Sequence, residues 1–173
     1  MSRTCHKIFF SVLLLLVSCS GRTPVVELQP ENSELMKENM INANRVVIQS
    51  EAAQIESYIQ RRGWPAQQLP SGAFFYQYTH GDGPSVLAND KVRVTYRLER
   101  LDGTPIYTHQ VDTLVVGHRD ATVALDDLLQ QLHYGSCAYL IAPSNSAYGV
   151  VGDGDRIHSR TVIVYNVSDI QKL

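Results

Sequence analysis

The stretch Val92-Arg93-Val94-Thr95-Tyr96-Arg97-Leu98-Glu99 alternates between apolar and polar side chains at every step. Successive side chains of a β-strand point to opposite faces of a sheet, so this alternation is typical of a strand with one buried face. The pair Asp102-Gly103 follows and is a preferred sequence for a hairpin turn. A second extended segment is therefore expected to begin around Ile106 and to continue this sheet.

Downstream of the hairpin, short apolar runs alternate with a single helical pattern. The run Leu114-Val115-Val116 predicts a strand, and so do residues 138–142 and the β-branched segment 161–167. Between them, leucines recur three, four and seven residues after Leu125, which is the spacing of one short amphipathic helix ending near Gly135. Together these elements predict an α+β fold, in which an antiparallel β-sheet wraps around one short helix.

In residues 34–62, ahead of the expected sheet, apolar residues recur at the spacing of a helix. Ser33 is suited to cap this helix, and Gly63 before Trp64-Pro65 is suited to end it. Its apolar stripe must pack either on the chain's own body or on a second copy in a homodimer, and the sequence leaves both open. Five residues at steps of seven, four, three and four form this stripe: Ile41, Ile48, Ala52, Ile55 and Ile59.

The first 18 residues have the features of an export signal. A basic start with Arg3 and Lys7 precedes the apolar run 8–17, which is too short to cross a bilayer as a stable helix. The following Leu16-Val17-Ser18-Cys19 resembles the lipobox of bacterial lipoproteins, in which the cysteine is acylated and the chain is cut before it. An ordinary secretory signal with an incidental Cys19 is the alternative.

These features predict a lipoprotein anchored to a membrane of the cell envelope, in the periplasm or at the outer membrane. Residues 19–33 would be a tether, 34–62 a helix, 63–72 a linker and 73–173 the main domain. Removing the signal takes away two basic residues and no acidic one, leaving 13 basic against 17 acidic residues. No cluster of Lys or Arg remains, so a nucleic acid is not an expected partner.

No cofactor or metal site is expected from the sequence. The histidines after the signal lack the paired spacing of metal ligands, and no cysteine accompanies them: His80, His109, His118, His133 and His158. Asp153-Gly154-Asp155 has no acidic residue at the distance that a calcium loop requires. Gly and Asp are common turn residues, so this stretch is expected to be a loop.

The segments that join these elements resemble the FKBP family of peptidyl-prolyl cis-trans isomerases over roughly residues 73–173. The most specific piece is Ile141-Ala142-Pro143-Ser144-Asn145-Ser146-Ala147-Tyr148-Gly149, which is close to the family's Ile-Pro-x-x-x-Ala-Tyr-Gly. Tyr96 precedes an Asp-Gly turn, as the family's pocket tyrosine does. Further segments resemble the entry to the pocket helix, its exit, the closing loop and the last strand: Gly117 with 121–125, 132–135, Ile157, and 162–167.

The resemblance implies a pocket that binds proline-containing polypeptides and favours a twisted X-Pro amide. The Tyr148 hydroxyl and the backbone N–H of Thr122 would bind substrate carbonyls, and Tyr96 would complete the catalytic set. Residues expected to line the pocket beside Tyr96 are Ile106, Tyr107, Leu125, Ile157 and Tyr165.

The sequence departs from the family at several pocket positions. Tyr107 stands where most active members have an aspartate, so Tyr96 is expected to lack its carboxylate partner. Ile106 and Leu125 replace aromatic residues, and Ala121-Thr122 replaces a Val-Ile pair. Three functions follow: a membrane-anchored isomerase assisting the folding of exported proteins, a catalytically weak or inactive peptide-binding module, or a purely structural lipoprotein.

Overall fold

The computed structural model describes residues 30–173, so the expected signal, the acylated Cys19 and most of the tether lie outside the described residues. The chain divides into two compact units, Met1–Ile41 and Asn42–Leu173. Within the described part, no helix combines the length and the apolar character needed to cross a membrane.

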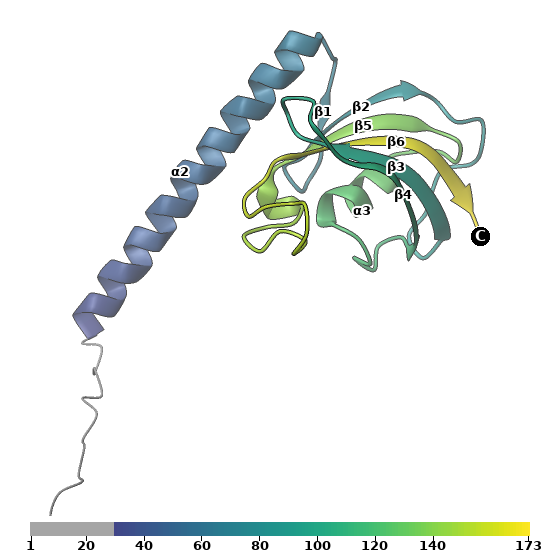
Figure 1. Ribbon diagram of the computed structural model, residues 1–173. Coiled ribbons are helices and arrows are strands. Elements are labelled where there is room, and N and C mark those ends of the chain that lie inside the picture. Colours follow the sequence, from purple (N-terminus) through teal and green to yellow (C-terminus); the bar gives the residue numbers. More distant parts are fainter. Residues whose placement is uncertain (1–29) are drawn as a thin grey trace, which may run out of the picture. The chain divides into compact units, whose positions relative to one another are not determined.

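The second unit is built on one antiparallel sheet of six strands. Their order is β1-β2-β5-β6-β3-β4, and Figure 1 shows the sheet curving over the short helix α3 (Val123–Leu129). This arrangement confirms the expected α+β fold class. The strands are β1 (Gln67–Gln68), β2 (Phe74–Thr79), β3 (Lys91–Glu99), β4 (Pro105–Val115), β5 (Cys137–Ala142) and β6 (Ile163–Lys172).

The alternating stretch forms β3 as expected, and its apolar face is buried. Val92, Val94 and Leu98 are almost fully buried, and they join the leucines of α3 in the main hydrophobic core. The extended segments expected near Ile106 and Leu114 are one continuous strand, β4. The β3–β4 pairing shifts register twice between Tyr96 and Glu99, which lets the 11 residues of β4 pair with the 9 residues of β3.

Helix α2 spans Pro30–Arg62 and therefore begins before the expected cap at Ser33. Proline suits the first helical position because its missing N–H would have no intrahelical partner there. Only the C-terminal end of the expected stripe is buried: Ile55 is 1% exposed, whereas Ile48 is 52% exposed. The N-terminal part of the stripe is exposed in the single chain.

The buried end of α2 packs on a second hydrophobic cluster, on the face of the sheet opposite α3. Ile55 and Tyr58 cluster there with Ile141, Val162 and Val164. Along β5 and β6 these residues alternate with residues that face α3, such as Leu140 and Tyr165, so both faces of these two strands are covered where α2 packs. The C-terminal end of the stripe therefore packs on the chain's own body.

Residues 63–72, expected to be a linker, belong to the second unit. They contain β1, which pairs with β2, and the side chain of Leu69 is buried in the main core. Trp64 stacks on Tyr139 with ring centroids 4.4 Å apart and on Tyr76 at 5.5 Å. The composition break in this segment is therefore not a boundary between compact units.

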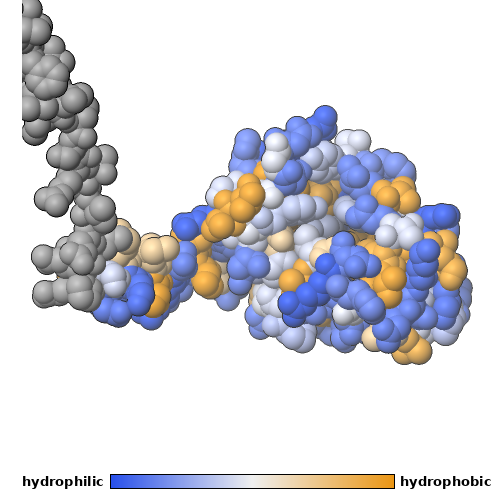
Figure 2. Space-filling model, turned by 90° about the horizontal axis from the view of Figure 1, so that it is seen from below, coloured by the Kyte–Doolittle hydropathy of each residue, from blue (hydrophilic) through white to orange (hydrophobic). Residues whose placement is uncertain are grey.

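The described part of the first unit is the beginning of α2. Its side chains Leu35, Met36 and Met40 are all more than half exposed, and apolar patches are visible on the helix in Figure 2. Lys37 and Glu34 form an exposed ion pair there at 2.8 Å. A homodimer formed through this helix stays a prediction.

Candidate functional site

A cavity of about 370 Å³ lies where the start of α3 meets the sheet. Five of the eight expected site residues line it, and they come from β3, α3, the loop after β5, and β6. The lining residues are Tyr96, Asp112, Asp120, Ala121, Thr122, Leu125, Ala147, Tyr148 and Tyr165.

Tyr96 has a carboxylate partner, contrary to the expectation from the sequence. Its hydroxyl donates to Oδ2 of Asp112 at 2.6 Å. Asp112 lies opposite Val94 in the β3–β4 ladder, and Val94 and Tyr96 occupy the same face of β3. Burial raises the pKa of Tyr96 well above its ordinary value, and the Asp112 carboxylate raises it further. Asp112, which lies farther along β4 than Tyr107, is thus the carboxylate partner of Tyr96.

Thr122 stands at the N-cap of α3, with an extended backbone. Its Oγ1 accepts a hydrogen bond from the Leu125 N–H at 3.4 Å and lies 3.0 Å from the Tyr165 hydroxyl. Within residues 30–173, the backbone N–H of Thr122 donates to no other group. This N–H is therefore available to a carbonyl oxygen bound in the cavity, as the resemblance implies.

Tyr148 and Tyr165 both line the same cavity. Tyr165 is fully buried, and burial raises its pKa well above the ordinary value. Burial also raises the pKa of the partly buried Tyr148. The Tyr148 hydroxyl therefore stays protonated at neutral pH and can donate a hydrogen bond to a bound ligand. The ring of Tyr165 lies 5.5 Å from that of Tyr96, which completes an aromatic wall.

Ile106, Tyr107 and Ile157 do not line this cavity, so this part of the expected site is not brought together. Ile106 and Ile157 are buried in the main core. Leu125 lies between the core and the cavity, where it forms an apolar floor. A second cavity of about 380 Å³, beside α2, contains none of the expected site residues.

Tyr107 fastens the loop around Asp153 to β4. Its hydroxyl donates to Asp153 at 2.6 Å, and the other oxygen of Asp153 accepts the N–H groups of Asp155 and Ile157. Burial opposes ionisation of Asp153, but these hydrogen bonds outweigh it and hold the pKa at about 2. The Arg156 guanidinium lies over the Tyr107 ring and donates to the Ile106 carbonyl oxygen.

Replacing Tyr107 with Asp is expected to loosen this loop rather than to repair the pocket. The new carboxylate would lie near Asp153 and Asp155, and like charges at short range repel. Tyr107→Phe is the matched control, because it removes the hydroxyl without adding a charge. In Tyr107→Phe, an NMR titration should show the pKa of Asp153 rising from about 2 toward its ordinary 3.8.

The lowered pKa of Asp153 means that its hydrogen bonds stabilise the loop above about pH 4 and are lost as the pH falls toward 2. At neutral pH, Tyr107→Asp should show weaker amide protection at Ile157 than Tyr107→Phe, because only the new carboxylate repels Asp153. Equal protection in both variants would contradict the repulsion argument.

No protein-family model and no curated protein matches the sequence. Among solved structures, the chain is similar to a peptidyl-prolyl cis-trans isomerase from Pseudomonas syringae pv. tomato, with 24% identity and a TM-score of 0.59 over 75% of this chain and 92% of that one. It is also similar to AtFKBP13, with 20% identity and a TM-score of 0.56 over 62% of this chain and 98% of that one. The chain therefore has the FKBP-type fold, and the expected fold is confirmed.

Proposed function

We propose that the protein is a peptidyl-prolyl cis-trans isomerase that acts on proline-containing polypeptides. The observation that carries this proposal is the cavity itself. It combines an apolar floor at Leu125, an unused N–H at Thr122, a protonated hydroxyl at Tyr148 and the fixed ring of Tyr96.

These groups suit a reaction that needs no acid, base or nucleophile. Rotation about an X-Pro bond meets a barrier of about 18–20 kcal/mol, because the planar amide is stabilised by resonance. A site accelerates the rotation if it binds the twisted amide more tightly than either planar form. The apolar floor accommodates the proline ring and excludes water, while Thr122 and Tyr148 bind neighbouring carbonyl oxygens and hold the chain during rotation.

A peptide-binding module with little or no catalysis is the second candidate. It is favoured by the modest apolar surface of the floor, where Leu125 and Ala121 are smaller than the side chains typical of the family. The same hydrogen-bonding groups would still hold an X-Pro segment. Binding and rate measurements on one peptide separate the two functions.

The soluble chain beginning at Ser20 should accelerate cis-trans exchange of a short X-Pro peptide in an NMR exchange assay. Tyr148→Ala should lower kcat/KM about tenfold, which corresponds to roughly 1.4 kcal/mol of transition-state stabilisation. Tyr78→Ala is the matched control, since Tyr78 is exposed on β2 and bonds to Asn166 outside this cavity.

If the native chain binds the peptide but leaves exchange at the uncatalysed rate, the binding module is favoured over the isomerase. A chain that neither binds nor accelerates would refute both functions.

We further propose that the protein acts on exported polypeptides from a membrane of the cell envelope, anchored through acylated Cys19. The basic start, the apolar run and the lipobox-like sequence support this proposal. Two acyl chains or more give the stable anchoring that one chain does not. Cys19→Ser should leave an uncleaved or soluble protein in membrane fractionation, and unchanged processing and membrane binding would contradict the proposal.

A further inference from the structure

A buried carboxylate from α2 binds the turn that carries Tyr148. Glu51 is 5% exposed, and its two oxygens accept hydrogen bonds from the Ser144 N–H at 2.8 Å and the Ser144 hydroxyl at 2.6 Å. Ser144 opens the short 3-10 helix η1 (Ser144–Ser146), whose N-cap Pro143 provides no side-chain hydrogen bond. Glu51 therefore supplies the missing cap from a distant part of the chain.

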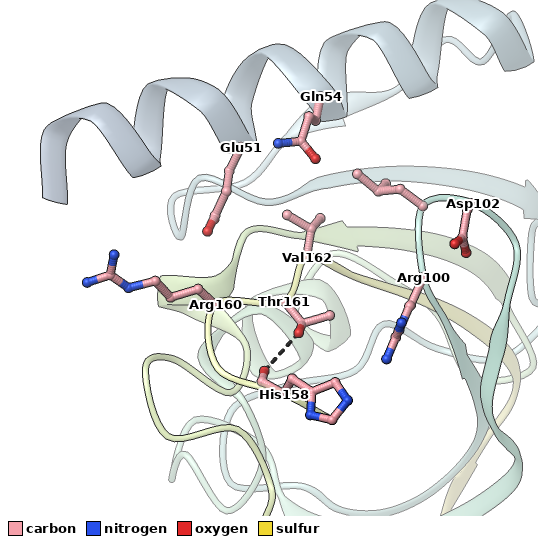
Figure 3. A pocket seen from close by; sticks show the side chains of 9 residues that line it. Glu51, Gln54, Arg100, Asp102, His158, Arg160, Thr161 and Val162 are labelled. Atoms are coloured by element: carbon pink, nitrogen blue, oxygen red, sulfur yellow. Dashed lines mark hydrogen bonds between the residues drawn. The ribbon is translucent and has the colours of Figure 1, made fainter. Parts of the chain in front are cut away.

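Glu51 has no ion-pair partner within residues 30–173. Figure 3 shows it reaching from α2 toward the loop that carries Val162, at the wall of the 380 Å³ cavity. Arg160 lines the same cavity but donates to Asn44 instead. Because a buried charge is costly unless it is hydrogen-bonded, the bonds to Ser144 account for its place in the structure.

The hydrogen bonds of Ser144 continue directly to the site. Its carbonyl oxygen accepts the Gly149 N–H at 2.7 Å and the Ala147 N–H at 3.2 Å. Ala147 and Tyr148, which both line the site cavity, therefore lie within a turn closed at Ser144. The Gly149 carbonyl oxygen in turn accepts the Arg160 N–H at 2.9 Å, which ties the end of the turn to the next loop.

We propose that Glu51 is a positioning residue for the site: it fixes Ser144, and through the 144–149 turn it sets the place of the Tyr148 hydroxyl. This inference rests on the proposed function, because the hydroxyl is taken to bind the substrate. It assigns α2 a part in activity as well as in stability.

The test compares soluble chains beginning at Ser20 that carry Glu51→Ala, Glu51→Gln or, as the matched control, Glu56→Ala. Glu56 is an exposed carboxylate on the same helix. NMR chemical shifts of the Tyr148 ring and the Gly149 amide report the conformation of the 144–149 turn. The value of kcat/KM reports catalysis at the site, and urea unfolding reports the stability of the fold.

Glu51→Ala should shift the Tyr148 and Gly149 signals and lower kcat/KM about tenfold under conditions in which the chain stays folded. Glu51→Gln should keep most of the activity, because its amide can accept from the Ser144 N–H and donate to the hydroxyl. Glu56→Ala should behave as the native chain. If Glu51→Ala lowers only the urea midpoint and leaves the signals and kcat/KM unchanged, the proposal is overturned.

Two further outcomes are decisive. If Glu51→Ala does not fold, Ser144→Ala takes its place, since it removes only the hydroxyl bond; an unshifted Tyr148 signal in that variant overturns the proposal. If the native chain shows no isomerase activity, the proposed function fails. In that case the Tyr148 and Gly149 signals alone test whether Glu51 positions the turn.

Discussion

A chain shortened to begin at Ala66 is expected to lose most of its stability, even though every strand and α3 remain. The shortening removes Ile55 and Tyr58, which are buried against Ile141, Val162 and Val164. Truncating one large buried side chain typically costs about 2–5 kcal/mol, against a total stability of about 5–15 kcal/mol for a domain. Removing both side chains should therefore leave a large unfolded fraction at room temperature.

A chain beginning at Asn42 is the matched control, because it keeps the whole second unit. Urea unfolding of the two chains should give a far lower midpoint for the Ala66 chain. Equal midpoints would mean that α2 contributes nothing to the folded body and that the boundary expected at 63–72 was right.

The α+β fold class could be predicted from the sequence because its signals are local. Alternation in β3 and leucine spacing in α3 each lie within a few residues, and both elements are present. The end of the helix was predicted wrongly: α3 ends at Leu129 and not near Gly135, and Leu132 is buried in the turn that follows. The packing of α2 could not be predicted in this way. It depends on contacts between Ile55 and strands β5 and β6, far away in the sequence, and the polar segment around Gln67 gives no sign that it forms an edge strand.

Part of the site could be predicted, because some of its residues lie next to elements that the sequence marks clearly. Residues beside well-defined joints, such as Thr122 at a helix start and Tyr148 after a strand, lie where the resemblance placed them. Tyr107 was assigned from the resemblance, but its hydroxyl donates to Asp153 and not to Tyr96. Two register shifts between Tyr96 and Glu99 move Asp112 from a place opposite Val92 to one opposite Val94, next to Tyr96 on the same face. Counting residues from the turn does not reveal this position.

The largest effect on activity is expected from Asp112, whose carboxylate fixes the hydroxyl of Tyr96. Asp112→Ala leaves this buried hydroxyl without its acceptor at 2.6 Å. A hydrogen bond to a charged group contributes about 1.5–3 kcal/mol, which corresponds to about tenfold to a hundredfold in rate if it is lost fully in the transition state. We therefore expect kcat/KM to fall within this range.

Three comparisons make the expectation for Asp112 specific. Asp112→Asn keeps an acceptor oxygen and should lose less activity, while the pKa of Tyr96 should fall, because a negative charge that raises it is gone. Asp82→Ala removes an exposed charge elsewhere and should leave kcat/KM unchanged, which excludes an effect of net charge. In Tyr96→Phe, adding Asp112→Ala should cost little, because the bond between the two residues is already absent. If instead the two substitutions reduce kcat/KM by independent factors, Asp112 acts on the substrate directly and not through Tyr96.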